Sequence, residues 1–153
     1  MKLSDILDIN NIIITLKADN KKKVIEELTE VIVDTGPSLN KDSLIKVLLE
    51  RERLGSTGIG DGVAIPHGKF SGINDPIISF GRSTKGVDFE AMDGRPVSLF
   101  FLLVAPEDSA SVHLKALAKI AKILKNNLLR KELLDARTKE EIYQLIIQDD
   151  EDF

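Results

Sequence analysis

An apolar segment in the second half of the chain restricts the fold more than any other feature. It runs from Val97 to Ala105 and consists of Val-Ser-Leu-Phe-Phe-Leu-Leu-Val-Ala. The segment is shorter than the roughly 18 residues that a membrane-spanning helix needs. From Val97 to Val104 it lacks the alternation of a strand with one face in water, which predicts a central strand covered on both faces. Pro106 ends the strand, and helices on both sides of its sheet are expected.

Other apolar patterns predict the remaining strands and the first helices. β-branched apolar runs predict strands at Ile12 to Leu16, Ile77 to Arg82 and, as a further candidate, Val87 to Glu90. Apolar residues three and four positions apart predict one helix from about Asn20 and a second that Asn40 caps.

Three helical segments fill the last third of the chain, with Ser109 or Ser111 and then Thr138 as candidate caps. The length of 153 residues fits one domain, so residues 1–153 are predicted to form a single unit. Residues 149–153 are predicted to be a frayed acidic tail. The fold class predicted is α/β: a single domain with a mixed, mostly parallel β-sheet flanked by helices on both faces.

Composition excludes several functional classes. The chain has no cysteine, which excludes disulfides, thiol catalysis and cysteine-ligated metals. Its formal net charge of -4 argues against general nucleic-acid binding. Neither a membrane-spanning run nor the layout of a signal peptide is present, so a cytoplasmic location without membrane insertion is expected. Only His67 and His113 are available for chemistry that needs an imidazole near neutral pH.

A glycine-dense segment precedes the first of these histidines. Successive free N–H groups in such a loop form a concavity for anions, and Ser56 and Thr57 add hydroxyl donors. A flexible surface turn is the commoner structure for a glycine loop alone. Val63 occupies a glycine position that the Walker A and dinucleotide-binding motifs each require, so ATP and NAD sites are poorly supported. Five of the chain's 10 glycines lie in the segment: Gly55, Gly58, Gly60, Gly62 and Gly68.

His67 follows this loop, between Pro66 and Gly68. A lone histidine is more often a surface or core residue than a reactive one. Here the proline and the glycine restrict the backbone and leave space beside the ring. A neutral imidazole with one nitrogen held by a hydrogen bond can attack phosphorus through the other, which gives a phosphohistidine. We therefore regard His67 as the candidate acceptor of a phosphoryl group.

The segment around His67 resembles a known family. Its sequence from Arg51 to Lys69 is Arg-Glu-Arg-Leu-Gly-Ser-Thr-Gly-Ile-Gly-Asp-Gly-Val-Ala-Ile-Pro-His-Gly-Lys. This stretch resembles the active-site motif of the fructose/mannitol class (type 2) of enzyme IIA domains of the bacterial phosphotransferase system, above all the nitrogen-regulatory enzymes IIA. The length, the order of elements and the run Leu-Val-Ala-Pro that precedes His113 extend the resemblance over nearly the whole chain.

The resemblance implies a role for particular residues. His67 matches the phosphorylated histidine, Arg51 an arginine that binds the phosphoryl group, and His113 a second histidine of the same pocket. His113 is otherwise a polar residue in a first helical turn. Arg53 and Lys69 either attract an anionic partner or are simply solvated. Ser56, Thr57 and Gly58 match positions of the loop that lines the phosphoryl group, and no cofactor or metal is implied.

The resemblance also implies partners. Phosphate would arrive from an HPr-type carrier protein, and the phosphorylated and free states would bind different regulatory proteins. An alternative is the enzyme IIA of a fructose- or mannitol-type sugar transporter, which passes phosphate to an enzyme IIB. A third possibility is a non-catalytic module that keeps the loop as an anion pocket. Whether the protein counts as an enzyme stays open: the expectation is a phosphotransferase-type phosphocarrier without small-molecule turnover.

Overall fold

The computed structural model describes residues 1–36 and 38–148. The predicted acidic tail, residues 149–153, lies outside the described residues. The strands are β1 (Leu7–Ile13), β2 (Gly58–Gly60), β3 (Val63–Ala64), β4 (His67–Phe70), β5 (Ile77–Val87) and β6 (Val97–Pro106). The helices are α1 (Leu3–Ile6), α2 (Lys21–Thr35), α3 (Lys41–Leu54), α4 (Ala110–Leu124), α5 (Asn127–Asp135) and α6 (Lys139–Ile147).

The strands form one sheet in the order β1-β5-β6-β3-β2, with β4 also paired to β6. Strands β3 and β4 run parallel to β6 along the same side, first with Val63 opposite Leu99 and then with His67 opposite Leu103. β1 is parallel to β5, whereas the β5–β6 and β2–β3 pairs are antiparallel. The predicted mixed, mostly parallel sheet is therefore confirmed for the described residues.

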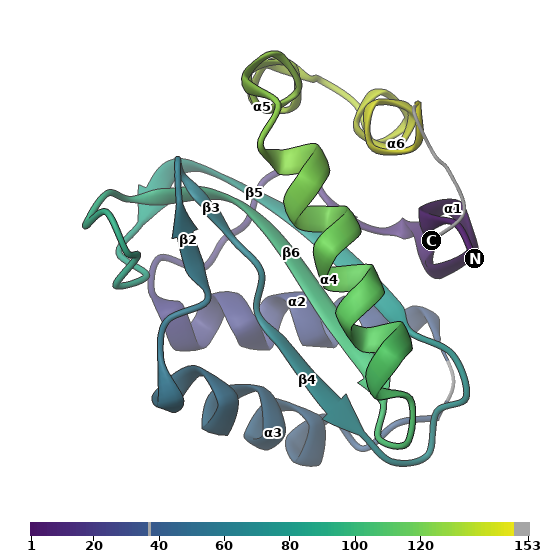
Figure 1. Ribbon diagram of the computed structural model, residues 1–153. Coiled ribbons are helices and arrows are strands. Elements are labelled where there is room, and N and C mark those ends of the chain that lie inside the picture. The colour runs from purple at the N-terminus through teal and green to yellow at the C-terminus, as the bar shows by residue number, and fades with distance from the viewer. Residues whose placement is uncertain (37, 149–153) are drawn as a thin grey trace.

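The apolar segment from Val97 to Ala105 lies in β6, at the centre of the sheet. Its residues from Leu99 to Ala105 are at most 1 % exposed, as expected of a strand covered on both faces. Figure 1 shows α2 and α3 on one face of the sheet and α4 on the other. The core divides accordingly: Phe100 packs with residues of α2 and α3, and Phe101 packs with residues of α4, α5 and α6.

Side-chain caps begin several helices as predicted. Asn40 accepts a hydrogen bond from Ser43 N, and Thr138 accepts one from Glu141 N. Ser109 precedes α4, but its side chain makes no capping hydrogen bond. Each bonded cap satisfies one of the N–H groups that the first turn of a helix leaves without an intrahelical partner.

Several predicted elements differ from the structure, among them the strand predicted at Ile77 to Arg82, which extends to Val87. The strand predicted at Ile12 to Leu16 begins at Leu7 and ends at Ile13, because β1 is an edge strand whose exposed positions carry polar residues such as Asp8. Of the candidate strand at Val87 to Glu90, only Val87 lies in a strand, as the last residue of β5, and Phe89 is buried in the connection that follows. The glycine-dense segment was expected to be a loop that ends in an extended piece at Val63-Ala64-Ile65. β3 confirms that extended piece at Val63 and Ala64, whereas β2 was not predicted. Within the described residues, no helix combines the length and the apolar character needed to cross a membrane.

Candidate functional site

His67 lies at a break between two short strands on the same side of β6. Pro66 separates β3 from β4 because it has no N–H group to donate to the ladder, although its carbonyl still accepts Leu103 N at 2.9 Å. β4 then begins with His67, opposite Leu103. The side chain is partly buried. His67, the phosphoryl acceptor predicted from the sequence, therefore lies in a strand that pairs with the central strand β6 and not in a free loop.

Gly68 explains how α3 approaches this position. A Cβ atom at Gly68 would lie 3.1 Å from Val47 Cγ1 and 3.4 Å from Leu48 Cδ2, both on α3. Such contacts are tighter than a close-packed interior normally contains, so a glycine lets the helix and β4 pack closely. The end of α3, which carries Arg51, is thereby held near His67.

The ring of His67 has a defined orientation and tautomer. Its Nδ1 lies 2.7 Å from the carbonyl oxygen of Ile65. A carbonyl only accepts, so Nδ1 donates its hydrogen, and in the neutral ring Nε2 keeps the free electron pair. Burial lowers the pKa of His67 and outweighs the raising effect of the Ile65 hydrogen bond; Arg51 lowers this pKa further and Glu52 raises it. The neutral ring is therefore favoured.

His113 lies in the first turn of α4, where the chain folds back over the sheet after β6 (Figure 1). Its ring meets that of His67 edge to face, with centroids 5.3 Å apart. The residue is 6 % exposed, and its Nδ1 has no hydrogen-bond partner in the part of the chain that the structure describes. Burial, followed by the charges of His67, Lys69 and Arg51, lowers its pKa to about 4.

Arg51 lies in the last turn of α3, where its Nη1 donates to the carbonyl of Gly55 at 2.9 Å. Its positive charge acts on the pKa of both imidazoles, and that of Lys69 acts on the pKa of His113. Such an arrangement suits a group that gains negative charge, because the guanidinium presents several N–H donors in one plane.

The loop residues predicted to line the site form hydrogen bonds within the chain. Ser56 Oγ donates to the carbonyl of Phe89 at 2.7 Å and accepts from Gly58 N. Thr57 is buried, and its Oγ1 donates to Glu52 Oε2 at 2.6 Å. Gly58 begins β2, opposite Ala64. Both hydroxyl groups are therefore engaged in holding the loop in shape.

Glu52 is a buried residue near the site that was not predicted from the sequence. It is 6 % exposed and accepts both the N–H and the hydroxyl of Thr57. A signal for it was present in the sequence, because Glu52 continues the inward-facing positions Leu44 and Leu48 at a spacing of four residues. A carboxylate at such a position requires partners inside the protein.

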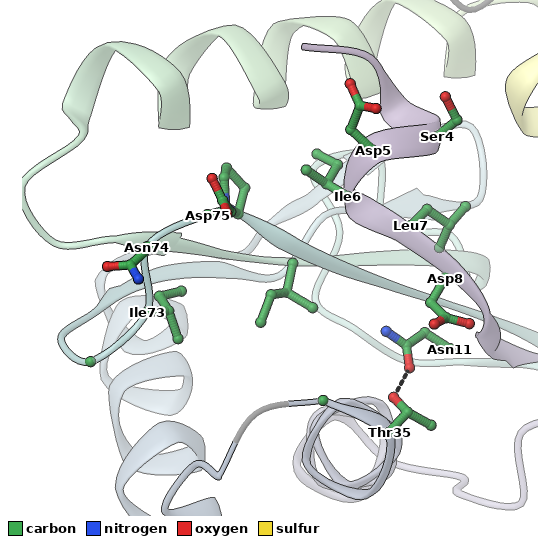
Figure 2. Close-up of a pocket in the computed structure, with 14 residues that line it drawn as sticks. Ser4, Asp5, Ile6, Leu7, Asp8, Asn11, Thr35, Ile73, Asn74 and Asp75 are labelled. Atoms are coloured by element: carbon green, nitrogen blue, oxygen red, sulfur yellow. Dashed lines mark hydrogen bonds between the residues drawn. The ribbon is translucent and has the colours of Figure 1, made fainter.

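A separate cavity of about 500 Å³ lies between α1, the end of α2 and the segment before β5, and Figure 2 shows its lining. None of the six predicted site residues contributes to it. Asn11, in its wall, donates to the carbonyl of Ile78 and accepts from the hydroxyl of Thr35, so its amide is already paired. Over residues 1–36 and 38–148, no three His, Cys, Asp or Glu side chains group as metal ligands would.

Comparison with known proteins identifies one family and relatives of two kinds. Residues 5–149 match the family model described as "Phosphoenolpyruvate-dependent sugar phosphotransferase system, EIIA 2". The nitrogen regulatory protein of Bradyrhizobium diazoefficiens is 41% identical over 147 residues, which cover 95% of this chain and 95% of that protein. The fructose-specific EIIABC component of Bacillus subtilis is 37% identical over 150 residues, but these cover 98% of this chain and only 24% of that protein.

A solved structure agrees with these sequence relatives. The nitrogen regulatory protein IIA-Ntr from Neisseria meningitidis superimposes with a TM-score of 0.88 at 34% identity. The match covers 94% of this chain and 98% of that one. The fold therefore agrees with that of IIA-Ntr along almost the full length of both chains.

Proposed function

The chain belongs to the EIIA 2 family of the phosphoenolpyruvate-dependent sugar phosphotransferase system, and on that basis we propose that it is a phosphocarrier of the nitrogen-regulatory type. It accepts a phosphoryl group on His67 from an HPr-type carrier protein in the cytoplasm. The added negative charge of about two units then changes which regulatory proteins bind. The hydrogen bond from His67 Nδ1 to the carbonyl of Ile65 is the observation that carries this proposal.

The transfer follows from the tautomer of His67. The electron pair on Nε2 attacks the phosphorus atom of the donor's phosphohistidine, and a new N–P bond forms as the donor's N–P bond breaks. The electron pair of the broken bond returns to the donor's imidazole. The hydrogen stays bound to Nδ1, which donates it to the carbonyl of Ile65 throughout. The lowered pKa of His67 supports this role because a protonated ring has no free electron pair to attack with.

Arg51 and His113 are proposed to hold the phosphoryl oxygens. The guanidinium of Arg51 supplies N–H donors besides the one bonded to Gly55, and its charge opposes that of the phosphoryl group. The neutral ring of His113 donates one hydrogen bond. Ser56, Thr57 and Gly58 are proposed to border the group, chiefly by shaping the loop, because both hydroxyls donate inside the chain.

The experiment is phosphoryl transfer from phosphoenolpyruvate through an enzyme I and an HPr-type carrier. The wild type is expected to gain one acid-labile, alkali-stable phosphoryl group, located at His67 by mass spectrometry. His67→Ala should stay unlabelled, whereas His113→Ala should still be labelled, but more slowly. Full labelling of His67→Ala, or an unlabelled wild type with several such carriers, would contradict the proposal.

A second candidate function is that of the enzyme IIA of a sugar uptake system. The 37% identity to one part of a fructose-specific EIIABC component favours it. Purified enzyme IIB of the fructose or mannitol type, added to the phosphorylated protein, distinguishes the two. Rapid loss of label to the enzyme IIB would support sugar transport. Retention of label, with a set of bound proteins that differs between wild type and His67→Ala, would support regulation.

A further inference from the structure

A continuous series of hydrogen bonds leads from a buried carboxylate to His67. It begins with Glu52 in the last turn of α3, whose side chain is 4% exposed. Glu52 Oε1 accepts Thr57 N at 2.9 Å, and Oε2 accepts Thr57 Oγ1 at 2.6 Å. Both oxygens of the carboxylate thus fix one residue of the glycine-dense segment.

The series continues through the backbone of two residues. The carbonyl of Thr57 accepts Ile65 N at 3.0 Å. The carbonyl of Ile65 in turn accepts His67 Nδ1 at 2.7 Å. Thr57 is hydrogen-bonded to Glu52 and to Ile65, and Ile65 is hydrogen-bonded to Thr57 and to His67. A displacement of Thr57 is therefore expected to move the carbonyl group that holds the His67 ring. Glu52 is therefore linked to His67 without touching it.

We propose that Glu52 is a positioning residue for His67: its carboxylate fixes Thr57, which places the Ile65 carbonyl that keeps the hydrogen of His67 on Nδ1. The inference rests on the proposed phosphoryl acceptance at His67, because the tautomer matters for a nucleophile at Nε2. If the Ile65 carbonyl were displaced, the ring would be free to carry its hydrogen on Nε2, and that nitrogen would have no electron pair with which to attack phosphorus.

The choice of a carboxylate at this position supports the proposal. Leu44 and Leu48 precede Glu52 on the same inward face, where a third apolar residue would avoid the cost of burying a charge. Glu52 is instead satisfied by Thr57 and by Lys21 Nζ, which lies 3.1 Å from Oε1. A buried carboxylate with these partners holds its neighbours in one arrangement, because separating any of them leaves a polar group unpaired.

Lys21 connects the carboxylate of Glu52 to Phe89 and Glu90, which lie beyond β5. Its ammonium group also lies 3.4 Å from Glu90 Oε1 and 4.8 Å from the centroid of the Phe89 ring. The carbonyl of Phe89 accepts the hydroxyl of Ser56, the residue before Thr57. Glu52 therefore contacts the loop directly at Thr57, and Lys21 links it to Phe89, which holds Ser56.

The charge of Glu52 has a second effect. Glu52 raises the pKa of His67, whereas the adjacent Arg51 lowers it. The two neighbouring residues of α3 thus act on the ring with opposite signs. A change that removes the charge of Glu52 but keeps its shape is therefore expected to lower the pKa of His67, which gives the test an electrostatic readout besides the tautomer.

The test compares substitutions that separate these effects, using the whole chain. Thr57→Val removes the hydroxyl at nearly constant shape, and Thr57→Ser restores it. Glu52→Gln keeps an acceptor for Thr57 N but removes the charge. Glu50→Gln makes the same charge change two residues away on the exposed side of α3 and is the matched control. Nitrogen chemical shifts of His67 report its tautomer and pKa by NMR, and phosphoryl transfer reports the rate.

The wild type and Thr57→Ser are expected to carry the hydrogen on Nδ1. Thr57→Val should shift a measurable fraction to Nε2 and slow transfer by about tenfold, the effect of losing roughly one hydrogen bond. Glu52→Gln should lower the pKa of His67. Glu50→Gln should leave the tautomer and the pKa of His67 as they are in the wild type. Loss of stability in Thr57→Val and Glu52→Gln with the tautomer, pKa and rate of the wild type would overturn the inference.

The NMR readout needs no phosphoryl donor, so the two proposals fail separately. If the wild type accepts no phosphoryl group, the proposed function fails, and the tautomer of Thr57→Val still decides the role of Glu52. If the wild type is phosphorylated and the His67 spectra of all variants are identical, the positioning role fails and the proposed function stands.

Discussion

The ring of His67 meets that of His113 edge to face, with centroids 5.3 Å apart and planes inclined by 70°. Both residues have a pKa below the ordinary histidine value of 6.5, in each case chiefly because of burial. Two histidines that are both neutral can divide the work of phosphoryl transfer, because one presents an electron pair while the other donates a hydrogen bond. This relationship leads to the first two predictions.

The first prediction concerns titration. In an NMR titration of the wild type, His113 is expected to titrate at a pKa of about 4, and His67 at a pKa below 6.5. The rate at which His67 accepts a phosphoryl group should therefore begin to decrease at a lower pH than it would for a histidine with the ordinary pKa of 6.5. Phosphorylation of His67 should raise the pKa of His113, because a nearby negative charge favours the imidazolium. A pKa of 6.5 for His113 in the free protein would contradict this prediction.

The second prediction concerns stability in acid. The pKa of His113 is about 4 in the fold and 6.5 when unfolded, so the unfolded chain binds more protons between these values. The neutral form contributes stability that is fully present above pH 6.5 and is lost as the pH falls through about 4. Between pH 7 and about pH 4.5 the wild type should lose about 2 to 3 kcal/mol more than His113→Asn. Urea unfolding of both proteins at the two pH values measures this, and equal losses would argue against it.

The third prediction concerns Arg51. Arg51→Ala should slow phosphoryl transfer by about ten- to a hundredfold, because a charged donor to the phosphoryl oxygens is lost. The fold should remain, since the side chain is partly exposed and its hydrogen bond is to Gly55 at the helix end. Arg53→Ala is the matched comparison, because Arg53 is exposed and contributes to the pKa shift of neither histidine. Equal rates for wild type and Arg51→Ala would remove Arg51 from the site.

The fourth prediction compares two glycines of the same segment. A Cβ atom at Gly58 would lie 2.9 Å from both Cα and Cβ of Ala91, and backbone cannot move aside cheaply. Gly58→Ala should therefore destabilise the protein by about 1 to 3 kcal/mol. At Gly55 no atom lies within 4 Å of such a Cβ, so Gly55→Ala should be neutral or slightly stabilising. Urea unfolding measures both, and similar losses would show that crowding at Ala91 is not the cause.

The fifth prediction concerns Arg82 in β5, which is 7% exposed. Its guanidinium donates to the carbonyls of Ile14, Leu133 and Ala136 and so holds the end of α5 against the sheet. Arg82→Leu should cost about 3 kcal/mol of unfolding free energy, because these carbonyls, of which those of Leu133 and Ala136 are buried, lose their donors. Arg137→Leu, an exposed arginine just after α5, should change it by less than about 0.5 kcal/mol. Equal effects would exclude a role for the buried contacts.

Local patterns were sufficient for much of the fold. The apolar run from Val97 predicted the central strand and helices on both faces, because a strand without polar positions cannot face water. Asn40 and Thr138 were correctly predicted as caps, because a cap acts on N–H groups two or three residues away. The boundaries of β1 were missed, since an edge strand carries polar residues on its exposed side.

For the site, too, some features were predicted from local sequence and others were decided only by the tertiary structure. Its motif is continuous from Arg51 to Lys69, so the sequence identified the family and the candidate residue His67 without any tertiary information. The resemblance implied that His113 shares the pocket of His67, but the sequence could not determine the burial of His113 or the edge-to-face contact of the two rings. Those facts arise because β4 pairs with β6 in one register and α4 folds back from the end of that strand. Long-range pairing of this kind depends on packing between distant segments and leaves no periodic trace in the chain. The burial of Glu52 did leave a signal, in its helical spacing from Leu44 and Leu48, but the series of hydrogen bonds from Thr57 to His67 did not.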